Sequence, residues 1–187
     1  MGRKSKSEEK RHTILNAFES VILRDGYANA SQRKIAEEAG VNQPMIHHYF
    51  SGGDELLSAL LERITERYRD ALSSFANTEA SPSLESILGF LCSEEFHQVS
   101  MQNEVMFCLI GQSKHHETTI KQLSNVYHHL IEELKKYLEL AGIKNLDQVA
   151  YTLMCIIIGH DWAKTLGFGE HKNKLMTETL STLAKTK

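Results

Sequence analysis

Apolar residues recur at steps of three and four along almost the whole chain, and no stretch shows the alternation of a half-buried strand. Serine, asparagine and glycine at several boundaries can cap helices, as at Ser31, Asn42 and Gly40. The pattern therefore predicts an all-α fold. The predicted helices cover about residues 8–24, 31–39, 42–49, 54–75, 82–97, 101–113, 117–141, 145–166 and 170–184.

The predicted helices are distributed unevenly. Three short ones occupy the first fifty residues, and those that follow are mostly longer and have the apolar spacing of a helical bundle. We therefore expect two domains, residues 1–50 and residues 51–187. The predicted helix 117–141 keeps apolar spacing of three and four residues throughout, at Ile120, Leu123, Tyr127, Leu130, Leu134, Tyr137 and Ala141.

Composition places the chain among ordinary globular proteins. Its 187 residues are 41% hydrophobic and 24% charged, and the net charge of −3 excludes a wholly basic nucleic-acid binder but not a local basic surface. The longest apolar run, Leu153 to Ile158, is far shorter than the ~20 residues of a membrane span. Cys92, Cys108 and Cys155 form no C-x-x-C motif and lie among apolar residues. We expect buried, reduced thiols in a cytosolic protein.

Residues 31–50 have the spacing of a helix-turn-helix. Ala36 and Gly40 are small enough for two short helices to cross closely, and Val41 and Ile46 can fill the corner between them. On the second helix, Gln43 can form paired hydrogen bonds with adenine and Met45 can contact a thymine methyl group. On the first helix, Arg33 can reach a guanine edge or a phosphate.

The N-terminal tail is basic. It could enter a DNA minor groove next to the second short helix, or it could be a solvated terminus. Its basic residues are Arg3, Lys4, Lys6, Lys10 and Arg11.

The segment IAEEAGVNQPMIHHYF, followed by DELL, resembles the DNA-binding domain of the TetR family of bacterial regulators. The resemblance covers about residues 8–60. It implies that Arg33, Gln43, Pro44 and Met45 contact bases, and that Ser31, His47, His48 and Tyr49 contact phosphates or sugars. Asn42, which precedes the second short helix, completes the expected DNA-binding set.

Two positions depart from the family pattern. His47 stands where the family commonly has tyrosine, and Gly53 stands where it usually has lysine. The loss of that lysine puts one phosphate contact in doubt. The free backbone amides of residues 52–54 could bind an anion instead, although Asp54 would oppose it.

The resemblance implies a function for each domain. Residues 1–50 would form a three-helix DNA-binding domain, and residues 51–187 a helical effector-binding and dimerisation domain. The chain would be a cytoplasmic homodimer and a repressor, with no enzymatic activity, cofactor or membrane partner. It would bind a palindromic double-stranded DNA operator. A small-molecule effector of unknown identity would release it by tilting the helix 54–75.

Candidate residues outside the first domain follow from the apolar pattern. A pocket between helices would be lined by Phe90, Met101, Met106, Phe107, Cys108, Tyr127 and Tyr151. A dimer interface would centre on Ile156, Ile157 and Trp162. His160 and Asp161 would lie at a seam between helices near that interface, or would serve as a ligand contact or pH-sensitive switch.

Two alternatives belong to other functional classes. Glu94, His97, His128 and Glu132 could bind metal in a helical-bundle enzyme, although the second Glu-x-x-His that such a site needs is not suitably placed. The helix-turn-helix could also be an adaptor that binds protein instead of DNA. Neither a glycine-rich phosphate loop nor a G-x-S-x-G motif occurs in the sequence.

Overall fold

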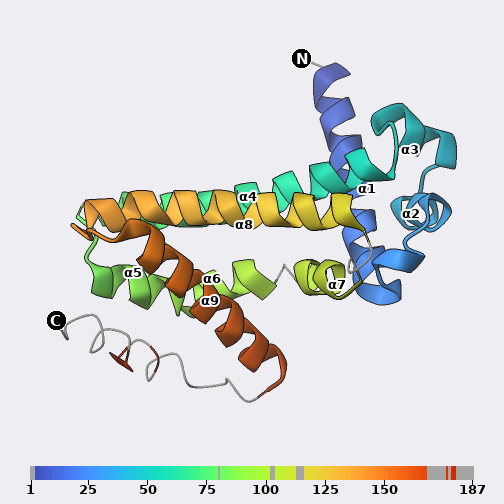
Figure 1. Cartoon of the computed structure of the whole chain (residues 1–187). Coiled ribbons are helices and arrows are strands. Elements are labelled where there is room, and N and C mark those ends of the chain that lie inside the picture. Colours follow the sequence, from blue (N-terminus) through green and yellow to red (C-terminus); the bar gives the residue numbers. More distant parts are fainter. Residues whose placement is uncertain are drawn as a thin grey trace. The chain divides into compact units, whose positions relative to one another are not determined.

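The structure, a computed structural model, describes residues 3–79, 81–101, 104–112, 116–167, 176 and 178–179. Every regular element in these ranges is a helix, which confirms the all-α prediction (Figure 1). The elements are α1 (Arg3–Asp25), η1 (Tyr27–Asn29), α2 (Gln32–Ala39), α3 (Gln43–Tyr49), α4 (Gly53–Thr78), α5 (Leu84–Leu91), α6 (Glu94–Met101), α7 (Glu104–Gln112), α8 (Glu117–Leu140) and α9 (Leu146–Thr165). The predicted helix 170–184 lies outside the described residues.

The chain divides into two compact units. The first unit comprises Met1–Ile64 and Asn103–Val126, and the second comprises Thr65–Gln102 and Tyr127–Lys187. Helices α4 and α8 therefore each supply their N-terminal residues to the first unit and their C-terminal residues to the second. A functional boundary between residues 50 and 51 stays a prediction.

The core of the first unit forms around α1. Its predicted inner face is confirmed, because Ile14, Phe18, Val21 and Ile22 are all buried. Helix α2 packs against α1, and α7 packs against both α1 and η1. Other buried residues of this unit are Ile35, Ala36, Ile46, Phe50, Leu56, Leu57, Leu60, Leu61, Ile64, Val105, Met106, Leu109, Leu123 and Val126.

The second unit has its own apolar cluster, drawn from α4, α5, α6, α8 and α9. Its buried members are Leu72, Ile87, Leu88, Leu91, Phe96, Leu134, Leu138, Ala150, Leu153 and Ile157. Aromatic rings extend this cluster: Phe75 stacks on Phe90 at a centroid distance of 4.6 Å, and Phe90 meets Phe96 edge-on at 5.3 Å. Offset and edge-to-face contacts of this kind stabilise a core beyond simple area burial.

The prediction of one helix over residues 82–97 is wrong. The chain forms α5 and α6 there, with Cys92 as the C-cap of α5. The Ser93 hydroxyl accepts a hydrogen bond from the Phe96 amide at 3.1 Å, which begins a new helix. Serine followed by two glutamates is a helix-start signal, and here it outweighs the continuous apolar spacing.

None of the helices in the described ranges is long and apolar enough to cross a lipid bilayer.

Candidate nucleic-acid interface

Two side-chain caps and one glycine set the angle of the helix-turn-helix. The Ser31 hydroxyl accepts a hydrogen bond from the Lys34 amide at 3.4 Å, so α2 begins at the predicted position. Gly40 ends α2 at φ +62°, a left-handed conformation that favours glycine. The Asn42 side chain then accepts a hydrogen bond from the Met45 amide at 3.0 Å and begins α3. The predicted helix-turn-helix is therefore present.

Helix α3 buries one side and exposes the other. Ile46 is completely buried, and Phe50, which ends the helix, is 1% exposed. The predicted base-contacting residues Gln43 and Pro44 are exposed, and Met45 is half-buried. Of the predicted phosphate contacts on this helix, His47 and His48 are exposed and Tyr49 is half-buried. The structure thus brings these six residues onto one short helix with an accessible polar side.

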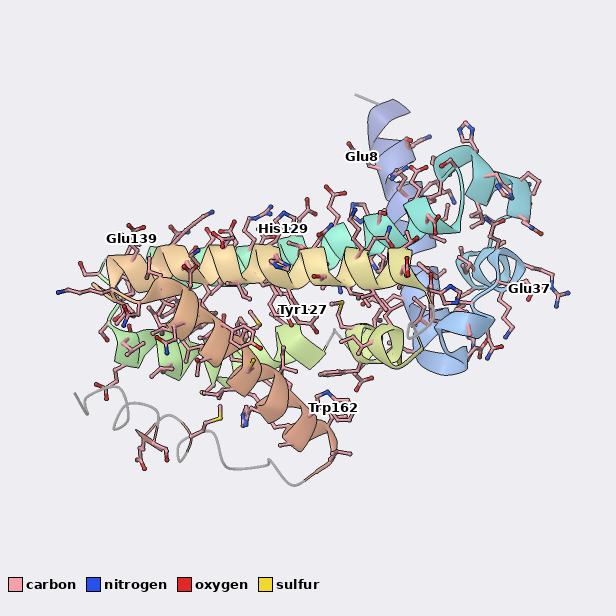
Figure 2. The ribbon with its side chains drawn as sticks, viewed as in Figure 1. Glu8, Glu37, Tyr127, His129, Glu139 and Trp162 are labelled. Atoms are coloured by element: carbon pink, nitrogen blue, oxygen red, sulfur yellow. The ribbon has the colours of Figure 1, made fainter. Side chains whose placement is uncertain are left out.

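The predicted contacts on α2 are exposed as well. Ser31 and Arg33 both face solvent. Glu37, labelled on α2 in Figure 2, lies with its Oε1 atom 3.8 Å from Nε of Arg33. An exposed pair at this distance contributes little stability, so the guanidinium can exchange Glu37 for a phosphate or a base at low cost.

A groove runs between the start of α1 and the end of α3. It has a volume of about 590 Å³ and is lined by Lys6, Ser7, Glu9, Lys10, Thr13, His48 and Tyr49. Lys6 and Lys10 lie one helical turn apart, because α1 begins at Arg3 and not at residue 8 as predicted. The tail is therefore helical from Arg3, and its lysines join a histidine of α3 in a groove with hydrogen-bond donors and one carboxylate.

Arg11 was assigned to the basic tail, and the structure places it elsewhere. Its guanidinium donates a hydrogen bond to the Tyr49 carbonyl oxygen and lies 4.3 Å from the centroid of the Phe50 ring. It also lies 3.8 Å from a carboxylate oxygen of Glu55 on α4. No local sequence signal links Arg11 to Tyr49, because 38 positions separate the two residues.

Ion pairs hold α2 and α4 against α1. Nη1 of Arg24 lies 2.6 Å from Oε2 of Glu38, and Nζ of Lys34 lies 2.8 Å from Oδ2 of Asp25. Hydrogen bonds from Lys34 and Arg24 lower the pKa of the Asp25 carboxyl group. Arg63 of α4 contacts Glu19 and donates a hydrogen bond to Asn16 at 2.6 Å. These contacts hold the elements that carry the exposed side of α3.

The start of α4 carries negative charge. The Glu55 carboxylate accepts a hydrogen bond from the Ser51 amide at 2.7 Å, and this bond, with Arg11 nearby, lowers the pKa of Glu55. Asp54 is also in the first turn. Two carboxylates at this helix end oppose the phosphate that the amides of residues 52–54 were expected to bind in place of the missing lysine.

The predicted pocket residues are divided between the two units. Met106, Phe107 and Cys108 lie on α7 in the first unit, whereas Phe90 and Tyr127 lie in the second. Tyr151 is 63% exposed on α9, so it does not line an interior wall. Met101 ends α6, and its side chain lies outside the description. These residues are therefore not assembled within either unit.

A buried polar pair in the second unit was not predicted. Nδ1 of His97 lies 2.9 Å from Oδ1 of Asp161, and both side chains are buried. Burial and the charge of Asp161 raise the pKa of Tyr127, labelled on α8 in Figure 2, to about 12. The sequence predicts that Asp161 lies at a seam between helices, but no local signal links it to His97, which is 64 positions away.

The four residues considered for a metal site do not form one. His97 pairs with Asp161. The carboxylates of the two glutamates lie against lysines: Oε2 of Glu94 is 2.8 Å from Nζ of Lys164, and Oε1 of Glu132 is 3.0 Å from Nζ of Lys135. His128 is exposed on α8. Within the described ranges, no three histidine, cysteine or acidic side chains are grouped to hold a metal ion.

The predicted dimer residues lie on different sides of α9. Ile157 belongs to the core cluster of the second unit, so its side chain is not available to a partner. Ile156 is half-buried, and Trp162 is 48% exposed.

Cys155 is exposed, which corrects the expectation of a buried thiol. We call the outer face of this helix the α9 stripe: Tyr151, Cys155, Ile158, Trp162 and Leu166.

Comparison with known proteins places the N-terminal residues in a family. Residues 14–60 match the family described as "Bacterial regulatory proteins, tetR family". The HTH-type transcriptional regulator PksA of Bacillus subtilis (strain 168) is 32% identical over 111 residues, which are 58% of this chain and 53% of PksA. The chain thus matches about half the length of that relative.

Two further similarities cover most of the chain. The HTH-type transcriptional regulator BetI of Klebsiella pneumoniae (strain 342) is 25% identical over 181 residues, 92% of this chain and 90% of that protein. The solved structure of the transcriptional regulator FadR from Bacillus subtilis in complex with stearoyl-CoA has a TM-score of 0.73 at 15% identity. That match covers 90% of this chain and 96% of FadR, and it shows similarity of fold.

Proposed function

We propose, from the premise that this chain belongs to the TetR family of bacterial transcriptional regulators, that it represses transcription by binding a palindromic DNA operator through α3. The observation that carries the proposal is the division of α3 into a buried side and an accessible one. Ile46 and Phe50 anchor the helix, while Gln43 and His47 remain exposed. A helix of this kind can enter a major groove and present donors and acceptors to base edges. Because bacterial DNA lies in the cytoplasm, the proposed binding of an operator implies a cytoplasmic location.

The groove between α1 and α3 supports contact with the DNA backbone. Lys6, Lys10 and His48 line it, and Lys6 and Lys10 carry positive charge that attracts a phosphate. The imidazole ring of His48 adds a nitrogen that can donate a hydrogen bond to a phosphate oxygen. Backbone contacts of this kind would fix the register of α3, while Gln43 and Met45 would supply sequence preference.

The decisive experiment separates base reading from general attraction to DNA. Genomic fragments are first selected with the wild-type protein, and affinity is then measured on a selected fragment and on a random duplex. Gln43→Ala should weaken binding to the selected fragment by about 1–3 kcal/mol and leave the random duplex almost unchanged.

The matched control is Asn125→Ala, which removes an exposed side-chain amide from α8. It should leave both affinities unchanged. Equal losses on both duplexes for Gln43→Ala would contradict a base-reading role. A wild-type protein that selects no fragment would contradict the proposed function as a whole and would favour the adaptor that binds protein.

We also propose that the second unit binds a largely apolar effector carrying a polar group. The aromatic rings of Phe75, Phe90 and Phe96 in this unit are the observation that favours an apolar ligand. The buried pair of Asp161 with His97, which follows Phe96 in α6, favours a polar group on that ligand. FadR, which shares this fold, was crystallised with stearoyl-CoA. Acyl-CoA thioesters and free fatty acids are therefore the first probes.

The test is a thermal shift followed by a release assay. A true effector should raise the unfolding temperature and also displace the protein from its selected fragment, because the two states must differ in ligand affinity. A ligand that stabilises the fold without affecting DNA binding would not be an effector.

We propose that the chain is a homodimer that pairs through the α9 stripe. Tyr151, Trp162 and Leu166 are 63%, 48% and 64% exposed, a large apolar area for one helix. Faces of this kind commonly serve as protein interfaces, and aromatic residues often contribute most to their binding energy. Two copies related by a twofold axis would present two α3 helices to a palindromic operator.

A further inference from the structure

Several contacts of the first unit converge on Arg11. The side chain belongs to α1, yet its contacts lie at the junction between α3 and α4. It donates a hydrogen bond to the carbonyl oxygen of Tyr49, the last residue of α3, and its guanidinium covers the ring of Phe50 at 4.3 Å. On its other side lies the carboxylate of Glu55, in the first turn of α4, at 3.8 Å.

Each of these contacts restrains a different part of the junction. The last carbonyl groups of a helix have no partner within the helix, so a cation that binds one of them fixes the helix end. The contact with Phe50 is a cation–π interaction, and the ring itself is 1% exposed and anchored in the core. Through Glu55, the same guanidinium reaches α4.

Glu55 extends the restraint to the connecting residues. One of its oxygens accepts a hydrogen bond from the Ser51 amide at 2.7 Å, while the other faces Arg11. The lowered pKa of Glu55 fits a carboxylate that remains charged in this arrangement. The short connection between α3 and α4 is thereby held at both ends.

We propose that Arg11 is a positioning residue for DNA recognition: with Glu55, it holds the end of α3 against the start of α4 and so sets the angle at which α3 meets the operator. This inference rests on the proposed DNA-binding function. Arg11 acts through α3 and does not contact DNA itself. Removing it should therefore reduce sequence discrimination, because base contacts depend on the orientation of α3 far more than general attraction to phosphates does.

Glu55→Gln gives a test in which two explanations predict opposite signs. The amide oxygen of glutamine can still accept from Ser51, but the charge attraction to Arg11 is lost. If Glu55 affects DNA only through its charge, removing a negative charge near the interface should strengthen binding to every duplex. If it positions α3, binding to the selected fragment should weaken while binding to a random duplex stays the same or strengthens.

Arg11→Gln distinguishes positioning from phosphate contact. We expect about a tenfold loss of affinity for the selected fragment, the scale of one charge-assisted hydrogen bond, with a clearly smaller loss on the random duplex from the removed positive charge and an unchanged salt slope. Arg11→Lys, which keeps the charge and a donor, should recover part of the loss. A phosphate contact would instead weaken both duplexes and reduce the salt slope by about 0.9.

Hydrogen exchange without DNA provides an independent readout. The Phe50 amide donates to the Ile46 carbonyl oxygen at 2.8 Å, and the Ser51 amide donates to Glu55. Arg11→Gln should accelerate exchange of these amides while α2 amides keep their wild-type rates. Unchanged exchange at both amides, or equal losses on the two duplexes, would overturn the proposal even if α3 binds DNA. If the wild-type protein selects no fragment, the proposed function fails, and the exchange result still decides whether Arg11 holds the junction.

Discussion

Helices α3 and α9 each bury one face and expose another, and their exposed faces have opposite chemistry. The accessible side of α3 carries Gln43, His47 and His48, whereas the α9 stripe is largely apolar. A polar face with few apolar atoms suits a hydrated, hydrogen-bonding partner such as DNA, and an apolar face suits another protein surface. In this chain, the side of a helix that the core does not use therefore indicates the class of partner.

Their buried faces differ as well. Helix α3 anchors itself with apolar residues, whereas α9 buries Asp161 together with apolar residues. A buried carboxylate is tolerated when it is paired, and Nδ1 of His97, one of the partners of Asp161, lies 2.9 Å from its Oδ1 atom. A substitution on the inner side of α9 that breaks this pair should therefore lower stability more than the loss of apolar contacts alone would.

The largest expected effect comes from breaking this buried pair. His97→Leu should lower the free energy of unfolding by about 3–5 kcal/mol, because Asp161 loses its hydrogen bond to His97 in a poorly solvated site. Urea unfolding followed by the fluorescence of Trp162, the single tryptophan, reports the second unit. His12→Leu, at an exposed position of α1, is the control and should have a small effect. Adding Asp161→Leu should recover part of the loss; a strictly additive double mutant would contradict coupling between the two residues.

Alkaline pH should weaken the same region. The pKa of Tyr127 is raised to about 12 in the folded chain, against about 10 for an unperturbed tyrosine. The folded state therefore holds this proton more tightly than the unfolded state. The resulting stability, about 2–3 kcal/mol, is fully present below pH 10 and is lost as pH rises toward 12. Tyr127→Phe should remove this part of the pH dependence, measured by unfolding at several alkaline pH values. An identical profile for the variant would assign the effect to other groups.

A charge on the outer side of α9 should separate the proposed dimer. Trp162→Glu should weaken association by at least about 2 kcal/mol, as expected for a central aromatic residue, and should leave the monomer folded because the side chain is already 48% exposed. Light scattering and circular dichroism measure the two quantities. Thr118→Glu, on an exposed part of α8, is the control. A variant that remains fully dimeric would move the interface away from the α9 stripe.

The smallest effect compares the two helix starts. Asn42 caps α3 through its side chain, whereas Asn145 precedes α9 without a side-chain capping bond. Asn42→Ala should therefore cost about 1 kcal/mol of stability, and Asn145→Ala should cost much less. Urea unfolding followed by circular dichroism tests both. Asn42→Ser should retain most of the stability, and equal losses at the two positions would argue against the capping bond as the cause.

The short N-terminal helices could be predicted from sequence because their signals are local. Ser31, Gly40 and Asn42 act within three or four residues of their own positions, so their roles follow directly from the spacing. The apolar face of α1 was equally clear. The structure adds Arg11, whose partners on α3 and α4 become neighbours only after the chain has folded.

Longer helices were harder to orient. In α8, Ile120 follows the regular apolar spacing but is 48% exposed, while Val126 and Leu138, which do not belong to that series, are buried. In α9, apolar residues occur on nearly every side, so periodicity could not tell that Ile157 faces the core and Tyr151 faces outward. Only packing against other elements decides which face of such a helix is covered.

The contact of α7 with α1 also has a consequence for how the chain is made. Val105 and Leu109 of α7 are fully buried in the unit that begins with α1, although about eighty positions of chain lie between α1 and α7. During synthesis from the N-terminus, α1 to α3 leave the ribosome long before α7 exists. Until α7 has been synthesised, the nascent helix-turn-helix therefore exposes part of its apolar surface to solvent. A fragment that ends after residue 64 should keep this surface exposed and should be prone to aggregation.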